Sequence, residues 1–223
     1  MKHVLFTASL IAMTSASGAA FATTQNPNQV FPHWYVGIAG GVTYLDDSDI
    51  SGTSTGEMGY DTGWTVNAAL GYTLPYGYDS RGNVRLELEA SYRENSLDNT
   101  ILSGVSAASP GRARIASYMV NGFYDFRNQS SLTPYIGGGF GLSQVGISHD
   151  SGLGNTGDDE DTVMAYQGMA GIAYAPMSMP NTEWTLGYRY FTADSPEYTT
   201  AGGKVKLDDL TSHSAEIGGR FKF

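Results

Sequence analysis

Residues 84–93 read Val-Arg-Leu-Glu-Leu-Glu-Ala-Ser-Tyr-Arg, and this stretch decides the fold class of the chain. Every second side chain, from Val84 to Tyr92, is apolar or aromatic, whereas those between them, from Arg85 to Arg93, are ionic or polar. Because successive side chains of a strand point to opposite faces, the stretch predicts a strand with one apolar face and one ionic face.

The same period of two recurs along the rest of the chain from Trp34 onward, and no segment has the period of an amphipathic helix. The sequence therefore predicts an all-β fold with eight strands, an even number. The expected strands cover residues 34–44, 64–73, 84–93, 117–126, 134–143, 164–174, 183–190 and 214–223.

The connections between these strands alternate in length. Short connections follow the second, fourth and sixth strands, and long ones follow the first, third, fifth and seventh. Short turns at one end and long loops at the other are typical of an eight-stranded antiparallel up-and-down transmembrane β-barrel. The short connections are 75–83, 127–133 and 175–181, and the long ones are 46–61, 94–111, 146–161 and 192–209.

Composition narrows the functional classes. The 223 residues include 29 glycines and no cysteine, and the formal net charge is −10. This acidic balance argues against nucleic-acid binding, which needs clustered Lys and Arg. The longest apolar stretch, Val4 to Met13, is too short for a membrane-spanning helix, which requires about 20 residues.

The first 22 residues predict export. Lys2 and His3 precede an apolar run, and Ala20-Phe21-Ala22 then places small residues before a break at Thr23. This is the three-part pattern of a secretory signal peptide cleaved near Ala22. The expected organisation is a signal peptide at 1–22, a short periplasmic segment at 23–31 and an outer-membrane barrel at 32–223.

The position of the apolar faces separates two kinds of barrel. In a soluble lipocalin-like barrel, which is the alternative, they would point inward. Here they carry bulky aromatics that would crowd the interior of eight strands, which is only wide enough for side chains to fill. We therefore expect the apolar faces to meet lipid, with an interfacial girdle formed by aromatic side chains. The expected girdle residues are Trp34, Tyr72, Phe126, Tyr188 and Phe223.

The end of the chain carries a resemblance to a known family. Glu216, Gly218, Phe221 and the terminal Phe223 match the C-terminal assembly signal of outer-membrane barrels. Over residues 32–223 the chain resembles the small eight-stranded barrels, which include the OmpA transmembrane domain, the opacity proteins and related surface antigens. The resemblance implies the outer membrane of a Gram-negative bacterium and insertion by the barrel-assembly machinery. The other segments that carry it are Trp34–Gly37, Tyr118–Phe126, Pro134–Gly139 and Leu186–Phe191.

The polar faces predict the contents of the lumen. Five bases meet five acids there, and charges in so narrow a space must be paired. We expect an ion-pair network that largely plugs the barrel, whereas a narrow or gated porin-like channel is the alternative. Strand glycines such as Gly137 and Gly139 would leave space for Arg189 and Arg220, or for water. The predicted network comprises Arg85, Glu87, Glu89, Arg93, Asp125, Glu183, Arg189, Glu216, Arg220 and Lys222.

The long connections concentrate the acidic residues. Residues 46–61 and 146–161 hold five acids each and no Lys or Arg. We expect a solvated anionic surface facing outward, with divalent bridging to lipopolysaccharide phosphates as a minor role and adhesion to a host or surface ligand as a hypothesis. The expected roles are thus envelope integrity and surface interaction. The acidic positions singled out are Asp46, Asp47, Asp49, Asp158, Asp159, Glu160 and Asp161.

Catalytic and metal-binding patterns are weak. His213 neighbours Ser212 and Ser214, but adjacent strand residues face opposite ways, so no nucleophile–base pair shares a face. The four histidines are far apart, and without cysteine they predict no metal site. We expect no enzyme and no cofactor. A lipid-modifying enzyme or a protease of the outer membrane is the remaining alternative.

Overall fold

The computed structural model describes residues 32–46, 48–52, 56–60, 62–74, 82–102, 105–107, 111–126, 130–149, 160–194, 197–200, 203–207 and 209–223. The expected signal peptide and periplasmic segment, residues 1–31, lie outside them. Among the described residues, no helix is long and apolar enough to cross a membrane.

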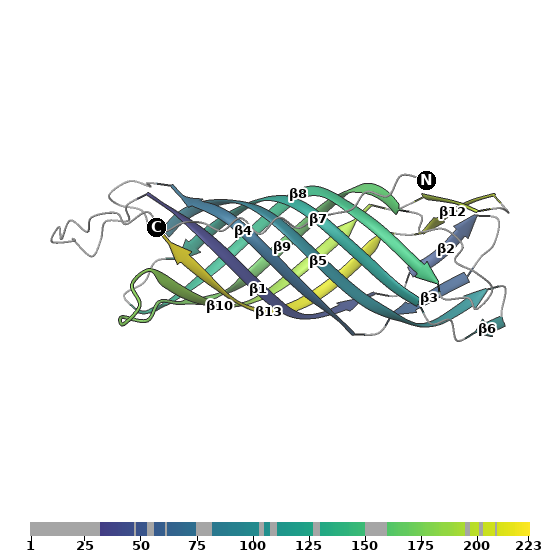
Figure 1. The fold of residues 1–223 in the computed structure, drawn as a ribbon, viewed down its shortest axis with the longest axis horizontal. Helices are drawn as coiled ribbons and strands as arrows, with labels where there is room; N and C mark the ends of the chain where they lie inside the picture. The colour runs from purple at the N-terminus through teal and green to yellow at the C-terminus, as the bar shows by residue number, and fades with distance from the viewer. Residues whose placement is uncertain are drawn as a thin grey trace.

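Eight long strands form the barrel, and each pairs in antiparallel fashion with the next one in the chain. Pairing of β1 with β13 closes the ring, from Tyr35↔Lys222 to Leu45↔Ser212. The strands run diagonally around one elongated barrel (Figure 1), and the predicted eight-stranded antiparallel barrel is thereby confirmed. These strands are β1 (His33–Leu45), β4 (Gly63–Thr73), β5 (Gly82–Leu102), β7 (Gly111–Phe126), β8 (Leu132–His149), β9 (Glu160–Tyr174), β10 (Thr182–Ala193) and β13 (Leu210–Lys222).

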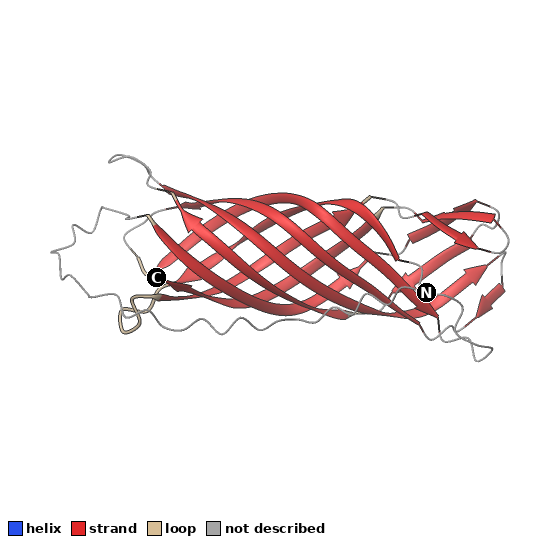
Figure 2. Cartoon of the chain, turned by 45° about the horizontal axis from the view of Figure 1, so that its top comes forward, coloured by secondary structure: helices blue, strands red, loops and turns tan. Residues whose placement is uncertain are grey.

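Two of the long connections, 46–61 and 192–209, differ most from the expected loops because they contain strands that extend the barrel wall. The distal part of β5 pairs with β3, β3 with β2, and β2 with β12, so segments far apart in sequence form one extension. Figure 2 shows these short strands gathered at one end of the barrel, hereafter the outer end. They are β2 (Ser48–Gly52), β3 (Gly56–Tyr60), β6 (Val105–Ala107), β11 (Glu197–Thr200) and β12 (Gly203–Leu207).

Three acidic positions expected in loops therefore lie in strands. Asp49 is part of β2, while Glu160 and Asp161 begin β9 and pair with Gly146 and Val145 of β8. These residues belong to strands because the backbone still pairs there, β2 with β3 and β9 with β8, beyond the apolar part of the sequence. Asp47, Asp158 and Asp159 lie outside the described residues.

The opposite end, hereafter the turn end, holds the C-terminus and the connection between β9 and β10 (Figure 1). In the connection between β9 and β10, the amide of Met179 donates to the carbonyl of Pro176 at 3.0 Å, and that of Thr182 to Met179 at 3.0 Å. Two such turns bring β10 back beside β9 within a few residues, so the barrel ends abruptly here.

The two faces of each strand divide as the alternation predicts. Outward-facing Ile38, Leu186 and Ile217 are 65 %, 64 % and 67 % exposed, whereas inward-facing Arg85 and Glu89 are 4 % and 5 % exposed. This is the reverse of a soluble protein, in which charged side chains are almost never buried and large apolar patches are rarely exposed. An apolar outer surface with a polar interior requires a lipid environment, which argues against the soluble lipocalin-like alternative.

A charge on the apolar outer face should impair folding in a bilayer. Leu88 is 61 % exposed and pairs with Val120 near the middle of β7, and Leu88→Arg should cost about 2–4 kcal/mol of stability in lipid vesicles. The measurement is urea unfolding followed by the gel shift between folded and unfolded protein.

Met177→Arg provides the matched control, because Met177 is 97 % exposed in the turn between β9 and β10. It should leave the unfolding midpoint unchanged. Equal midpoints for Leu88→Arg and the control would contradict a lipid-facing surface.

Candidate functional site

The barrel lumen gathers nine of the ten predicted charged residues, all except Arg93, into three clusters. Alternation along β5 places Arg85, Glu87, Glu89 and Arg93 on its inward face, and each of them is less than 9 % exposed. The partner side chains come from strands on every side of the ring. We call the groups the Arg85 cluster, the Arg189 cluster and the Glu183 cluster.

The Arg85 cluster lies toward the turn end. The guanidinium donates from Nε and Nη2 to the two carboxylate oxygens of Asp125, at 2.7 Å and 2.9 Å, and from Nη1 to Glu87 Oε1 at 2.6 Å. Nη1 also donates to the hydroxyl of Tyr35 at 2.7 Å, and that hydroxyl donates to Glu87. The cation lies 4.5 Å from the ring centroid of Phe123. Arg85 is thus held by a planar, two-pronged contact that a lysine would not reproduce.

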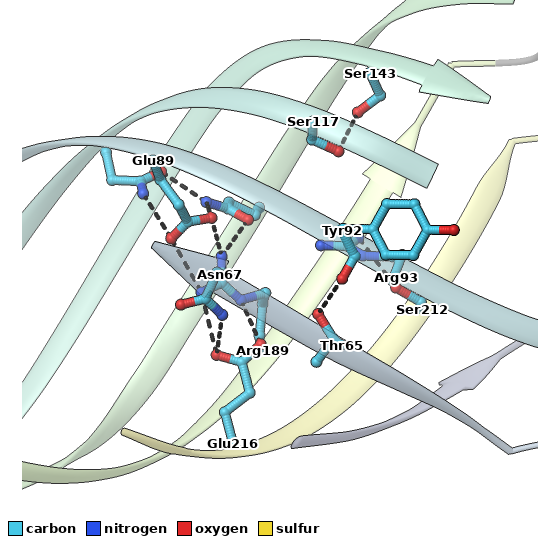
Figure 3. Close-up of polar contacts among 12 residues, drawn as sticks. Thr65, Asn67, Glu89, Tyr92, Arg93, Ser117, Ser143, Arg189, Ser212 and Glu216 are labelled. Carbon is cyan, nitrogen blue, oxygen red and sulfur yellow. Dashed lines mark hydrogen bonds and ion pairs between the residues drawn. The ribbon is translucent and has the colours of Figure 1, made fainter. Parts of the chain in front are cut away.

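The Arg189 cluster spans the lumen from β10 to β5, which face each other across the ring (Figure 3). Arg189 Nη1 donates to Glu89 Oε1 at 2.7 Å, and its Nε donates to Glu216 Oε1 at 2.9 Å. Asn67 and Gln167 donate from their amides to Glu216 and Glu89, each at 3.2 Å. Each of the two carboxylates therefore accepts hydrogen bonds from Arg189 and from a side-chain amide, as a buried charge requires.

The Glu183 cluster lies at the turn end. Lys222 Nζ lies 2.5 Å from Glu183 Oε1, and Arg220 Nε lies 3.4 Å from Glu183 Oε2. Here two cations share one carboxylate, whereas in the other two clusters one cation serves two carboxylates. The charges of the lumen therefore balance only as a whole and not within each cluster.

Arg93 departs from the predicted network. It lies in the lumen and is 1 % exposed, but no carboxylate of the described residues is within ion-pair distance of it. Its guanidinium carbon instead lies 3.6 Å from the ring centroid of Phe191, and Nη1 donates to Ser212 Oγ at 3.5 Å. The prediction of an ion pair was wrong because Arg189 already engages both nearby carboxylates, Glu89 and Glu216.

An apolar layer fills the lumen toward the outer end, and sequence reasoning missed it. Its side chains lie on the inward faces and are almost completely buried, and they are apolar although the inward faces elsewhere are polar. The signal was available, since Ile115 continues the face of Ser117, and Phe191 that of Arg189. The layer comprises Leu45, Ala113, Ile115, Met119, Val145, Ala165, Phe191, Ala193 and Leu210.

One strand glycine faces an arginine, as expected, since a Cβ on Gly37 would lie 3.6 Å from Arg220 Cγ, whereas others face inward-pointing rings. A Cβ on Gly137 would lie 2.3 Å from Phe123, and one on Gly71 would lie 2.1 Å from Tyr35. Gly139 faces Asn121 in the same way. Rings that point inward need strands without side chains opposite them, because the lumen of eight strands is narrow.

A cavity of about 70 Å³ remains near the Arg85 and Arg189 clusters. Its lining includes Gly37, Asn67, Glu87 and Glu216. Since a water molecule occupies about 30 Å³ of liquid volume, the cavity is of the size of a few waters. It is far smaller than the pocket of a drug-sized ligand, which measures about 300–1,000 Å³.

The expected girdle residues point outward, and four of them lie at the turn end. Trp34 and Tyr72 pack together, with 4.9 Å between their ring centroids, and Phe126 and Phe223 are 42 % and 61 % exposed. Tyr188 was expected at a strand end but lies in the middle of β10. Tyr188 is central because β10 continues to Ala193, beyond the predicted strand end at residue 190.

Within the expected assembly signal, Glu216 lies in the Arg189 cluster, and Gly218 also faces the lumen, where an added Cβ would meet Ala39. Phe221 and Phe223 are 51 % and 61 % exposed on the outer face. The signal's role stays a prediction.

His213 lies on the outer face, away from the serines beside it in sequence. Its Nδ1 is hydrogen-bonded to the hydroxyl of Tyr188 at 2.6 Å, and its Nε2 is 3.5 Å from Asp46. Ser212 and Ser214 are buried in the lumen, so no serine–histidine pair forms here. The described residues contain no group of three or more His, Asp or Glu that could hold a metal ion.

A closed antiparallel barrel with an apolar outer face and an ion-paired interior defines an integral outer-membrane β-barrel protein. Comparison with known proteins agrees: the chain belongs to the family described as outer membrane protein beta-barrel domain, which matches residues 8–223. The predicted localisation, the outer membrane of a Gram-negative bacterium, is thereby confirmed.

One sequence relative and one solved structure illustrate the likeness. Outer membrane protein PagN of Salmonella typhimurium strain LT2 is 30 % identical over 151 residues, which make up 60 % of this chain and 59 % of PagN. The chain therefore matches less than two thirds of the length of that relative. Neisserial surface protein A is similar in fold, with a TM-score of 0.53 and 19 % identity over 85 % of this chain and 97 % of the other.

Removal of Arg85 should be strongly destabilising, because it leaves the carboxylates of Glu87 and Asp125 buried without a cation. We expect Arg85→Gln to cost about 3–5 kcal/mol, as for other broken buried pairs. The measurement is the urea midpoint of the gel shift in vesicles.

Arg112→Gln is the control, since the side chain of Arg112 is 58 % exposed and lies 3.7 Å from Glu94. An exposed pair contributes about 0–1 kcal/mol. The triple variant Arg85→Gln, Glu87→Gln, Asp125→Asn should recover part of the loss. A midpoint for Arg85→Gln equal to that of Arg112→Gln would contradict the role of the Arg85 cluster.

Proposed function

We propose that the protein is a non-enzymatic surface protein that supports the integrity of the envelope and binds a partner outside the cell. The observation that carries this proposal is the filling of the lumen. Three ion-paired clusters and an apolar layer occupy the lumen, and the cavity beside the Arg85 and Arg189 clusters measures about 70 Å³. A barrel closed in this way offers its outer end, rather than its interior, for interaction.

The proposal of a closed lumen rests on the order of the layers. Small ions that enter from the turn end meet Glu183 and Lys222, then the Arg85 and Arg189 clusters, and then the apolar layer. Separating a buried ion pair costs several kcal/mol, and an apolar constriction excludes ions by dewetting. The two barriers act in series, which disfavours the alternative of a porin-like channel.

Conductance in planar bilayers tests the closed lumen. We expect at most small and infrequent steps from the protein extracted from outer membranes, because every path crosses both barriers. The double variant Phe191→Ala, Leu210→Ala removes bulk from the apolar layer and should raise the frequency of steps. Large, stable, porin-like steps from the unaltered protein would overturn the closed lumen.

The proposal of surface binding rests on the extended outer end. The wall continues into β2, β3, β6, β11 and β12, so the chain builds ordered structure there instead of short turns. Acids are concentrated in two of the long connections, five each in residues 46–61 and 146–161, with no Lys or Arg, and the first of these contains β2 and β3. An acidic surface favours partners with basic patches, through electrostatic complementarity.

Replacement of the four long connections by short turns, with the barrel retained, tests surface binding. We expect bacteria that display the trimmed barrel to adhere to cultured epithelial cells less than those with the full protein. Adherence of the full protein should also fall as salt rises, because exposed charges are screened.

The control is an equal amount of heat-modifiable barrel in both outer membranes, which shows that the trimmed variant still folds. Unchanged adherence at equal surface levels would count against the proposal. Adherence that is lost but insensitive to salt would retain the loops as the binding region and remove the acidic surface from the explanation.

A further inference from the structure

Arg93 is the buried cation of the lumen that the ion-pair network leaves without a carboxylate. Its Nε and Nη2 have no hydrogen-bond partner among the residues that the structure describes, although Arg93 is only 1 % exposed. The face of Phe191 and the hydroxyl of Ser212 make up its closest polar or aromatic contacts. A cation–π contact leaves the in-plane N–H donors of a guanidinium unused.

A belt of hydroxyl groups surrounds this position. Seven serine and threonine side chains from β1, β4, β5, β7, β8 and β13 face the lumen there, and each is at most 7 % exposed. We call them the hydroxyl belt. They are Thr43, Thr65, Ser91, Ser117, Ser143, Ser212 and Ser214.

Three members of the belt also lack a protein partner, namely the hydroxyls of Thr43, Ser91 and Ser214. The strand register places them close to Arg93. Ser91 is the preceding inward residue on β5, Ser214 follows Ser212 on the inward face of β13, and Thr43 is paired with Ser214 across the ladder. The four side chains with unused donors, Arg93, Thr43, Ser91 and Ser214, therefore occupy neighbouring inward positions of the barrel.

The two neighbouring layers supply no acceptor for these donors. On the outer side lies the apolar layer, with Leu45 and Ile115. On the other side, the oxygens of Glu89 and Glu216 are engaged by Arg189 and by the amides of Asn67 and Gln167. A buried polar group without a partner is costly, and a buried cation more so. What this level of the lumen lacks is a negatively charged acceptor.

We propose that Arg93 and the hydroxyl belt bind a small monovalent anion of the chloride class inside the barrel. N–H and O–H donors would surround it, and the planar guanidinium would neutralise it. A monatomic anion fits the chemistry because it accepts from any direction and donates nothing.

Halide-dependent stability tests this site. Protein extracted folded from outer membranes is exchanged into sodium gluconate and titrated with sodium bromide at constant ionic strength. The temperature at which the gel shift is lost should rise with bromide and then saturate, because a ligand of the folded state stabilises it. Arg93→Gln should abolish this dependence. Arg114→Gln alters an exposed arginine that lies 3.3 Å from Glu94, and it should retain the dependence.

Two further measurements keep the test decisive if Arg93→Gln does not fold. Ser91→Ala and Ser214→Ala remove hydroxyls without protein partners, so both should fold and should raise the half-saturating bromide concentration by about fivefold each, the factor of one ordinary hydrogen bond. Crystals grown in bromide should show anomalous density within hydrogen-bond distance of Arg93 Nε. Stability indifferent to bromide, or water alone beside Arg93, would overturn the proposal.

Discussion

The backbone hydrogen bonds between β1 and β13 are the constraint on which the rest of the structure depends. No water is available in the hydrocarbon of a membrane to satisfy a free strand edge, so a sheet crosses only if it closes on itself. The pairing from Tyr35↔Lys222 to Leu45↔Ser212 closes this ring. Once it is closed, every strand has one face toward lipid and one toward a narrow lumen.

That narrow lumen explains the chemistry inside. With eight strands, side chains from opposite walls meet, so Arg189 on β10 reaches Glu89 on β5 across the ring. The low dielectric makes each unpaired charge costly. Most cations are therefore matched by carboxylates, and the outer part is filled by apolar side chains such as Phe191 and Leu210. At the outer end, β2, β3 and β12 extend the wall beyond the filled part of the lumen.

Much of this arrangement could be predicted from the sequence, since the period of two assigns each strand residue to a face. Arg85 and Glu87 were placed correctly in the lumen because they share the polar face of one strand. The partner of Arg93 could not be predicted, because the choice depends on which side chains of β10 and β13 reach the same level. The strands within the long connections were missed because their pairing, as in β2 with β12, joins distant segments.

The sequence by itself determined the eight long strands of the barrel, the face on which their residues lie, and the alternation of short and long connections, because these follow from local alternation and turn chemistry. Only the tertiary structure decided which charges pair and where the apolar layer lies. It alone left Arg93 among hydroxyls instead of carboxylates. The physical reason is that alternation specifies the direction of a side chain, whereas its partner depends on the register of strands that meet only when the ring closes.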